Sequence, residues 1–257
     1  MRLYYIGRRE KFIACIVSIC ILLVALSFYL KPWEAVTSSR SNRLLPIYKV
    51  ASEEKNLAIS FDASWGATRT DRILDILDEY EVKTTFFLVN IWLEDYPDKA
   101  KKIISRGHEI GMHSVSHPDF TKLSEEQIKK ELLNNQKMIK DITSFEANLF
   151  RPPFGAYNNR LIQICSELNI YPIQWSVDSL DWKNITSGAM VERVIKADAG
   201  DIILFHNDGE NTPDALIEIL KDFKERGLQV VPISELIYKD DYYIDVNGVQ
   251  HTRKGMD

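Results

Sequence analysis

The alternation of apolar and polar positions between residues 57 and 232 predicts a regular succession of strands and helices. A strand-like run at 57–61 precedes a helical pattern at 70–80, and a second β-rich run follows at 83–89. Ser124 and Gln127 resemble a capping box at the start of a long amphipathic helix. The other predicted strands are 108–112, 171–177, 201–205 and 229–232, and the other predicted helices are 97–105, 124–143, 158–168, 188–197 and 214–226.

Repeated alternation of strands and helices predicts an α/β fold with a parallel sheet, either open or closed as a barrel. In both arrangements the side chains that perform chemistry gather at the carboxyl ends of the strands. Asp62 follows the first strand, and His113 and His117 follow the third. His206 follows the strand at 201–205. All four residues therefore fall where a functional site is expected.

The N-terminal region carries a continuous apolar run at residues 12–30 behind a basic segment at 1–11. At ~1.5 Å per helical residue this run is long enough to cross a hydrocarbon layer of ~30 Å. The positive charges before it favour a cytoplasmic N-terminus. We therefore expect a single-pass anchor in the cell membrane, with the rest of the chain outside the cytoplasm.

A cleaved signal peptide is the main alternative for this run, and a buried helix of a soluble domain is a weaker one. A signal peptide needs small residues at its cleavage site, whereas residues 27–33 include several large ones. The polar stretch 31–50 is interpreted as a linker, residues 51–239 as the single catalytic domain, and 240–257 as a polar C-terminal tail.

Composition narrows the function by exclusion. The chain has 257 residues and a formal net charge of −5, so it lacks the excess of basic residues that binding to nucleic acid requires. Cys15 and Cys20 lie in the apolar run and Cys165 stands alone, which excludes a disulfide within the domain. The apolar spacing around Cys165 indicates a buried helix face, so we interpret this thiol as part of the core rather than as a nucleophile.

The strand ends carry residues suited to a hydrolytic centre. His113 and His117 are four residues apart, a spacing that on a helical turn lets two imidazoles hold one metal ion, although capping or buried histidines also occur at this spacing. Asp62 is a candidate general base or a turn cap. His206 is a candidate proton donor or a structural histidine. Arg151 begins a proline-rich loop that presents a guanidinium and backbone amides at fixed angles, or that only makes a turn.

Taken together, five ordered segments within residues 50–237 resemble the polysaccharide deacetylase family, also called carbohydrate esterase family four or the chitooligosaccharide-deacetylase homology domain. They are Ser60-Phe-Asp62, His113-Ser-Val-Ser-His117-Pro118, Arg151-Pro-Pro-Phe-Gly155, Asp178-Ser-Leu-Asp-Trp182 and Ile203-Leu-Phe-His206. The resemblance implies a distorted (β/α) barrel of parallel strands. Residues 62–66 and 175–183 are most similar to the sporulation-associated deacetylases of Gram-positive spore formers.

The resemblance also implies the chemistry and the partners. A divalent metal, usually zinc, with cobalt, nickel or manganese as alternatives, would be held by His113 and His117 and would activate a water molecule. The substrate would be an N-acetylated cell-wall glycan, peptidoglycan above all. Trp182 would contact this substrate, and a backbone amide near Phe154 would stabilise the oxyanion.

The same resemblance assigns the proton transfers. Asp62 would take a proton from the water, with Arg151 orienting this carboxylate. His206 would protonate the leaving amine, with Asp181 holding its imidazole in place. The products would be acetate and a free amine on the sugar.

One position departs from the family pattern, because Ala63 stands where a third metal ligand is usual. A methyl group cannot bind a metal, so the ion would have only two histidines from the usual set, completed by water, by Asp62 itself or by another carboxylate. This leaves a second hypothesis, a catalytically silent protein that binds glycan or acts as a scaffold on the same fold. A glycoside hydrolase that uses Asp178 and Asp181 is a third hypothesis, but it leaves the histidines unexplained.

Overall fold

The computed structural model describes residues 7, 8, 13 and 43–254. From Leu44 onward the chain forms one compact unit. The predicted anchor at 12–30 lies, except for Ile13, outside the described residues, and so does most of the predicted linker. Where the structure describes the chain, it contains no helix with both the length and the apolar character needed to cross a membrane.

A parallel sheet forms the centre of the unit, with the strand order β6-β5-β4-β3-β2-β8-β7 and with β9 also paired to β2. Its parallel pairing confirms the predicted α/β fold. No pairing among the described residues joins the edge strands β6 and β7, so the sheet is a curled half-barrel rather than a closed barrel. The strands are β2 (Asn56–Ala63), β3 (Thr85–Leu88), β4 (Glu109–Met112), β5 (Leu149–Phe150), β6 (Tyr171–Pro172), β7 (Val177–Asp178), β8 (Ile202–His206) and β9 (Gln229–Val230).

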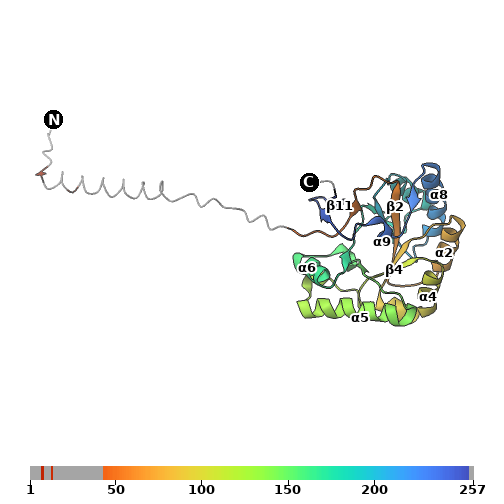
Figure 1. Cartoon of the computed structure of the whole chain (residues 1–257), viewed down its shortest axis with the longest axis horizontal. Helices are drawn as coiled ribbons and strands as arrows, with labels where there is room; N and C mark the ends of the chain where they lie inside the picture. Colours follow the sequence, from red (N-terminus) through yellow and green to blue (C-terminus); the bar gives the residue numbers. More distant parts are fainter. Residues whose placement is uncertain (1–6, 9–12, 14–42, 255–257) are drawn as a thin grey trace, which may run out of the picture. The chain divides into compact units, whose positions relative to one another are not determined.

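The helices of the unit pack on both faces of this sheet: most lie on its outer face (Figure 1), and the last, short helix packs with Ala58 and Phe87 on its inner face. They are α2 (Thr70–Glu79), α3 (Asn90–Asp95), α4 (Pro97–Ser105), α5 (Glu125–Thr143), α6 (Asn159–Glu167), α7 (Ser187–Val194), α8 (Thr212–Glu225) and α9 (Ile233–Leu236), with short 3-10 turns η1 (Phe120–Lys122), η2 (Pro153–Gly155) and η3 (Asp181–Lys183). The predicted capping box is present at the start of α5, where the side chains of Ser124 and Gln127 each accept a hydrogen bond from the backbone of the other. On α6, Cys165 is fully buried in the core, as predicted, and burial raises the pKa of its thiol to about 12.

Side chains of β2 alternate between two environments, and this alternation places the first functional residue. Leu57, Ile59 and Phe61 pack in the larger core with apolar residues of the helices. Ser60 and Asp62 point to the opposite face of the strand, toward the inside of the curled sheet. Because β2 ends at the rim of the half-barrel, Asp62 lies at the open end of that interior.

Two regions differ from the sequence prediction. The expected strand at 171–177 is divided into β6 and β7, because the chain leaves the sheet between them and the Gln174 carbonyl accepts a hydrogen bond from Arg151. A second sheet joins β1 (Lys49–Val50), β11 (Val249–Thr252) and β10 (Tyr242–Ile244). The folded unit therefore extends beyond the predicted boundaries at 51 and 239. The polar Gln250 is buried, and its side-chain amide forms hydrogen bonds with the backbone of Tyr238. Because the residues after 239 are mostly polar, their sequence did not indicate that they pack against the domain.

Candidate active site

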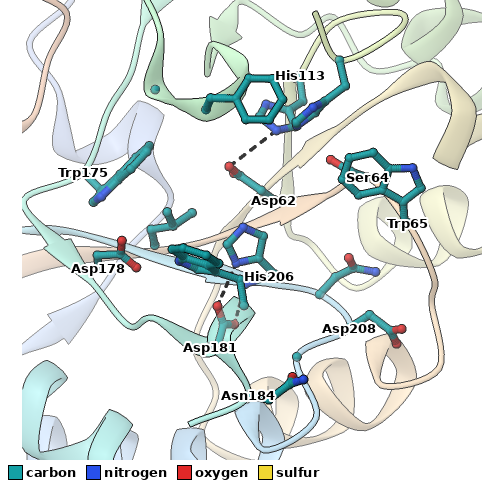
Figure 2. A pocket seen from close by; sticks show the side chains of 17 residues that line it. Asp62, Ser64, Trp65, His113, Trp175, Asp178, Asp181, Asn184, His206 and Asp208 are labelled. Carbon is teal, nitrogen blue, oxygen red and sulfur yellow. Dashed lines mark hydrogen bonds and ion pairs between the residues drawn. The ribbon is translucent and has the colours of Figure 1, made fainter. Parts of the chain in front are cut away.

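A pocket of about 660 Å³ opens at the carboxyl ends of the central strands (Figure 2). Asp62 is the residue before the last on β2, His113 follows β4, and His206 is the last residue of β8. Asp62 and His206 are direct partners in the pairing of β2 with β8. The parallel sheet thus brings together residues that are 144 positions apart in the sequence, as the strand-end argument predicted. The pocket is lined by Asp62, Ser64, Trp65, His113, His117, Phe154, Gly155, Trp175, Asp178, Asp181, Trp182, Asn184, Leu204, His206, Asn207, Asp208 and Gly209.

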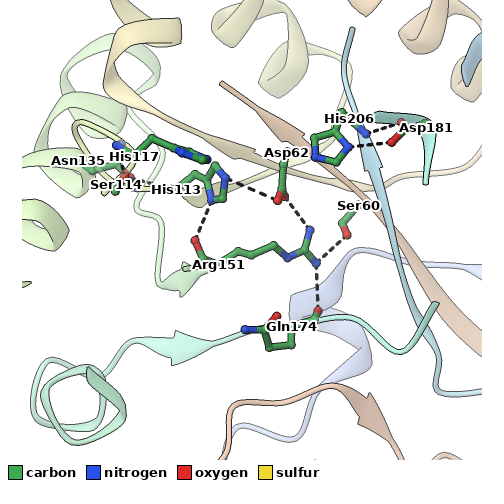
Figure 3. Close-up of polar contacts among 10 residues, drawn as sticks. All are labelled: Ser60, Asp62, His113, Ser114, His117, Asn135, Arg151, Gln174, Asp181 and His206. Atoms are coloured by element: carbon green, nitrogen blue, oxygen red, sulfur yellow. Dashed lines mark hydrogen bonds and ion pairs between the residues drawn. The ribbon is translucent and has the colours of Figure 1, made fainter. Parts of the chain in front are cut away.

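Arg151 holds the Asp62 carboxylate from inside the half-barrel (Figure 3). Its Nη1 donates to Asp62 Oδ1 at 2.8 Å, and its Nη2 donates to Ser60 Oγ at 2.8 Å and to the Gln174 carbonyl at 3.2 Å. Burial alone would raise the pKa of Asp62, but the charges of Arg151 and of two nearby histidines hold it below its usual value. Asp62 is therefore ionised at neutral pH and can accept a proton from a substrate or a water.

The Arg151 side chain is itself fixed by packing. Its guanidinium lies 4.2 Å from the centroid of the Phe87 ring. Gly111, the β4 partner of Phe87, makes room for that ring, because a Cβ at this position would lie 2.4 Å from a ring atom. The site thus depends on a glycine that contacts none of the reacting groups.

The first predicted metal ligand, His113, is oriented by a backbone carbonyl. Its Nδ1 donates to the Arg151 carbonyl at 2.8 Å, which leaves Nε2 directed into the pocket, 3.6 Å from Asp62 Oδ2. Burial is the largest cause that lowers the pKa of His113. The imidazole is therefore neutral at neutral pH, and its Nε2 lone pair is available to a metal ion.

The second predicted ligand, His117, lies on the same loop. Its ring packs against the exposed side chains of Trp65 and Phe154, with centroid separations of 5.0 and 4.6 Å, and its centroid is 5.0 Å from that of the His113 ring. Burial lowers its pKa to about 4, so this imidazole is also neutral. The prediction of a helical turn was wrong, because Ser114 and His117 have left-handed φ angles of 84° and 56°, which an α-helix does not allow.

The donor set suits a divalent ion only in part. Two neutral imidazoles that line one pocket are typical ligands of zinc and similar ions. Ala63 is buried in the core and contributes no donor, and Asp62 already binds Arg151 through one oxygen. In the part of the chain that the structure describes, no group of three His, Cys, Asp or Glu side chains is placed to hold one ion. The two imidazoles are therefore candidate ligands that line one pocket, and the described part of the chain does not complete them to a set of three.

On the opposite side of the pocket, Asp181 holds His206. Asp181 Oδ1 accepts from His206 Nδ1 at 2.7 Å, and Oδ2 accepts from the His206 amide at 2.7 Å and from Thr212 Oγ1 at 2.9 Å. Burial would lower the pKa of His206, but the hydrogen bond and the charge of Asp181 raise it above its usual value. This histidine can therefore be protonated near neutral pH, and because Nδ1 is bound to Asp181, Nε2 is the nitrogen that can donate to a bound molecule.

Exposed aromatic side chains form the outer rim of the pocket. Trp65, Phe154 and Trp182 are exposed there, and Trp175 is half-buried beside them; Trp65 and Trp175 stand in the segments that carry the family resemblance, but no role was predicted for either. An aromatic residue after a strand carries no signal of its own, since most aromatics belong to the core. The Nζ of Lys183 lies 4.7 Å from the Trp182 ring centroid. The rim offers flat apolar surfaces of the kind that sugar rings can cover.

The arrangement weakens the glycoside hydrolase hypothesis. Such an enzyme needs two carboxyl groups on either side of the scissile bond. Asp178 lines the pocket, but Asp181 is buried and accepts three hydrogen bonds from His206 and Thr212. Asp181 is therefore committed to positioning a histidine rather than to attacking a sugar.

Comparisons with known proteins agree with this geometry. The profile described as polysaccharide deacetylase matches residues 49–173. The chain is 34% identical over 196 residues to a peptidoglycan-N-acetylglucosamine deacetylase of Bacillus cereus, covering 74% of this chain and 92% of that protein. It is also 34% identical over 208 residues to the peptidoglycan-N-acetylglucosamine deacetylase PgdA of Listeria monocytogenes, covering 78% of this chain but only 44% of that relative.

A solved structure gives a further comparison. The crystal structure of wild-type BA3943, described as a CE4 family pseudoenzyme from Bacillus anthracis, superposes with a TM-score of 0.72 at 31% identity, covering 81% of this chain and 73% of that one. Similarity over most of the length of the Bacillus cereus deacetylase, together with the family profile, establishes the relationship. The chain belongs to the polysaccharide deacetylase family.

Proposed function

We propose that this protein hydrolyses the N-acetyl groups of an N-acetylated cell-wall glycan, with peptidoglycan as the substrate. The observation that carries the proposal is the pair formed by Asp62 and His206 across neighbouring strands. The environment lowers the pKa of the carboxyl group and raises that of the imidazole. An ionised base and a protonated acid in one pocket are what acid–base hydrolysis of an amide requires.

In the proposed reaction, Asp62 removes a proton from a water molecule as the water oxygen attacks the acetamide carbonyl carbon. Arg151 keeps the carboxylate in place and ionised. His206 then donates its Nε2 proton to the nitrogen, the carbon–nitrogen bond breaks, and acetate and a sugar amine are released. A divalent ion, with zinc as our proposal, would be held by His113 and His117 and would polarise the carbonyl when bound.

Two further residues would bind and orient the substrate. The Phe154 backbone, which has a left-handed φ of 61°, lies at the rim, where we propose that its amide faces the developing oxyanion. Trp182 is exposed beside the His206 side of the pocket, and we propose that it packs against the sugar ring. Asp181 acts through His206 and has no contact with the substrate in this proposal.

We also propose that the protein is attached to the cell membrane by residues 12–30 and acts on the wall side, in spore formation. The apolar run with its basic flank supports the anchor. The relatives of Bacillus cereus and Listeria monocytogenes are named as peptidoglycan deacetylases, which supports the envelope substrate.

A second candidate function is a catalytically silent protein that binds glycan. Two observations favour it: the missing donor at Ala63, and the similarity to BA3943, which is described as a pseudoenzyme. The pocket would then retain its aromatic rim for binding without turnover.

The test uses the full chain, stripped of metal with a chelator and then reloaded with Zn²⁺. Acetate release and binding are measured with N-acetylglucosamine oligomers and with peptidoglycan. Acetate release that requires Zn²⁺ and is lost in Asp62→Asn supports the enzyme. Oligomer binding without acetate supports the silent protein and contradicts the proposed hydrolysis.

A further inference from the structure

The loop that carries both histidines, residues 113–117 and here called the histidine loop, is held by the side chain of Asn135 on α5 (Figure 3). Asn135 Oδ1 accepts from the amides of His113 at 2.9 Å and Ser114 at 3.1 Å. Its Nδ2 donates to the Leu88 carbonyl at 3.1 Å and to Asn90 Oδ1 at 2.7 Å. Every polar group of this buried side chain is therefore engaged, and α5 is tied to the end of β3.

Glu131, one helical turn before Asn135, holds the rest of the histidine loop. Its Oε2 accepts from the amides of Val115 at 2.8 Å and Ser116 at 3.1 Å, and its Oε1 accepts from Ser116 Oγ at 2.9 Å. The last amide, that of His117, donates to Ser114 Oγ at 2.9 Å. Five consecutive backbone amides are thus bound by side chains, four of them by two residues on one face of α5.

This arrangement stabilises a backbone that is otherwise unfavourable. Ser114 and His117 both have left-handed φ angles, which cost free energy in residues other than glycine. Such conformations persist only where surrounding contacts fix them. Hydrogen bonds to the Glu131 carboxylate are charge-assisted and therefore stronger than neutral ones. The sequence alone does not indicate that Glu131 binds the loop, because a glutamate on the polar face of an amphipathic helix is usually exposed to solvent.

We propose that Glu131 and Asn135 are positioning residues that hold the histidine loop in metal-binding geometry before the ion arrives, and so offset the missing ligand at Ala63. The proposal rests on the two-histidine site of the proposed function. An ion bound by only two protein side chains gains little binding free energy. Ordering a flexible loop at the same time would use much of that gain. A loop that is already fixed removes this cost.

Glu131 is the residue best suited to a test, because it is half-buried and is not among the residues that line the pocket. Its substitution therefore changes the loop without removing a group from the pocket. Glu131→Ala removes both acceptor oxygens, whereas Glu131→Gln retains one. Glu126→Ala, an exposed position in the first turn of the same helix, is the matched control.

The experiment measures the Zn²⁺ affinity of the full chain by competition with a chromogenic chelator, with the Co²⁺ absorption spectrum and the melting temperature recorded alongside. We expect about tenfold weaker Zn²⁺ binding for Glu131→Ala, since residues that support metal ligands affect affinity by about 10–100-fold, and a smaller loss for Glu131→Gln. The Co²⁺ bands should change in shape for Glu131→Ala and stay unchanged for Glu126→Ala.

Two results would overturn the inference. One is Zn²⁺ binding by Glu131→Ala within about twofold of the unsubstituted chain together with an unchanged Co²⁺ spectrum; this outcome leaves the proposed function intact. The other is the absence of Zn²⁺ binding by the unsubstituted chain, which also removes the metal from the proposed function. If Glu131→Ala fails to fold, Glu131→Gln decides by the same criteria.

Discussion

The inner side of the pocket and its outer rim are built on opposite principles. On the inner side, Arg151 is fully buried and makes three hydrogen bonds, one of them to Asp62. On the rim, the exposed fractions of Trp65, Phe154 and Trp182 are 65%, 72% and 55%. The inner side holds the Asp62 carboxylate in one position, and the rim presents apolar surface to a ligand that enters the pocket.

This difference assigns separate tasks to the two regions. A buried charge network tolerates little change, because removing one partner leaves the other unpaired in a low-dielectric interior. An exposed aromatic side chain can be removed without disturbing the core. Substitutions on the inner side should therefore affect both catalysis and folding, whereas a substitution on the rim away from His117, such as at Trp182, should affect only the binding of glycan.

The largest effect is expected for Arg151→Met. The substitution leaves Asp62 buried without its cation, which should lower the free energy of unfolding by about 3–5 kcal/mol. Acetate release should fall by about a hundredfold or more, since Asp62 loses both its orientation and its lowered pKa. Urea denaturation and an acetate assay on the full chain provide the two measurements.

The surface pair of Arg72 with Asp214 supplies the control for this variant. Both side chains are more than half exposed, so Arg72→Met should change stability by less than about 1 kcal/mol. Equal losses of stability in the two arginine variants would contradict the claim that the buried pair of Arg151 and Asp62 contributes more to stability than a surface pair.

A smaller effect, visible mainly in the pH profile, is expected for Asp181→Asn. The raised pKa of His206 means that the proton donor, and the stability its pair with Asp181 contributes, are present at low pH and are lost as the pH rises through that pKa. Asp181 is the largest cause that raises the His206 pKa, so removing its charge lets burial lower that pKa against only the smaller effects of Asp62 and Asp178. The alkaline fall in acetate release should then move to lower pH, with a roughly tenfold loss near neutral pH.

The pH profile of acetate release across the neutral range measures this shift. Asp222→Asn, which affects a surface pair with Arg226, should leave the profile in place. If Asp181→Asn lowers the rate of acetate release equally at every pH and leaves the pH of the alkaline fall unchanged, Asp181 does not set the proton affinity of His206.

The smallest effect is expected on the rim. Trp182→Ala should raise KM for N-acetylglucosamine oligomers roughly tenfold, a loss of ~1.4 kcal/mol in binding, and leave kcat and the melting temperature nearly unchanged. Val246→Ala, at an exposed apolar position that does not line the pocket, should change neither constant. A fall in kcat with constant KM would instead show that Trp182 contributes to the chemical step, as the residues of the inner side do.

The sequence anticipated most of the fold because its elements are strongly periodic. The apolar spacing of 124–143 and the capping pair Ser124 and Gln127 predicted α5 almost to the residue. Parallel pairing then follows from the alternation of strands and helices. Closure of the barrel did not follow from periodicity, since two-residue strands such as β6 and β7 leave almost no periodic pattern.

The candidate site was anticipated by position at strand ends and by family resemblance. These arguments brought Asp62, His113 and His206 to one pocket. They gave the wrong local conformation for His117, because spacing alone does not distinguish a helical turn from a loop with left-handed residues. They also missed Glu131, whose role comes from three contacts with a loop 15 or 16 residues away in the sequence.

The central claim is that Asp62 and His206 together cleave an acetamide with water. Its most direct test is turnover of an N-acetylglucosamine oligomer by the Zn²⁺-loaded full chain in water labelled with heavy oxygen. The account predicts acetate that carries one solvent oxygen for each sugar amine formed, and no such acetate from Asp62→Asn. Tight binding of the oligomer with no labelled acetate from the unsubstituted chain would contradict it.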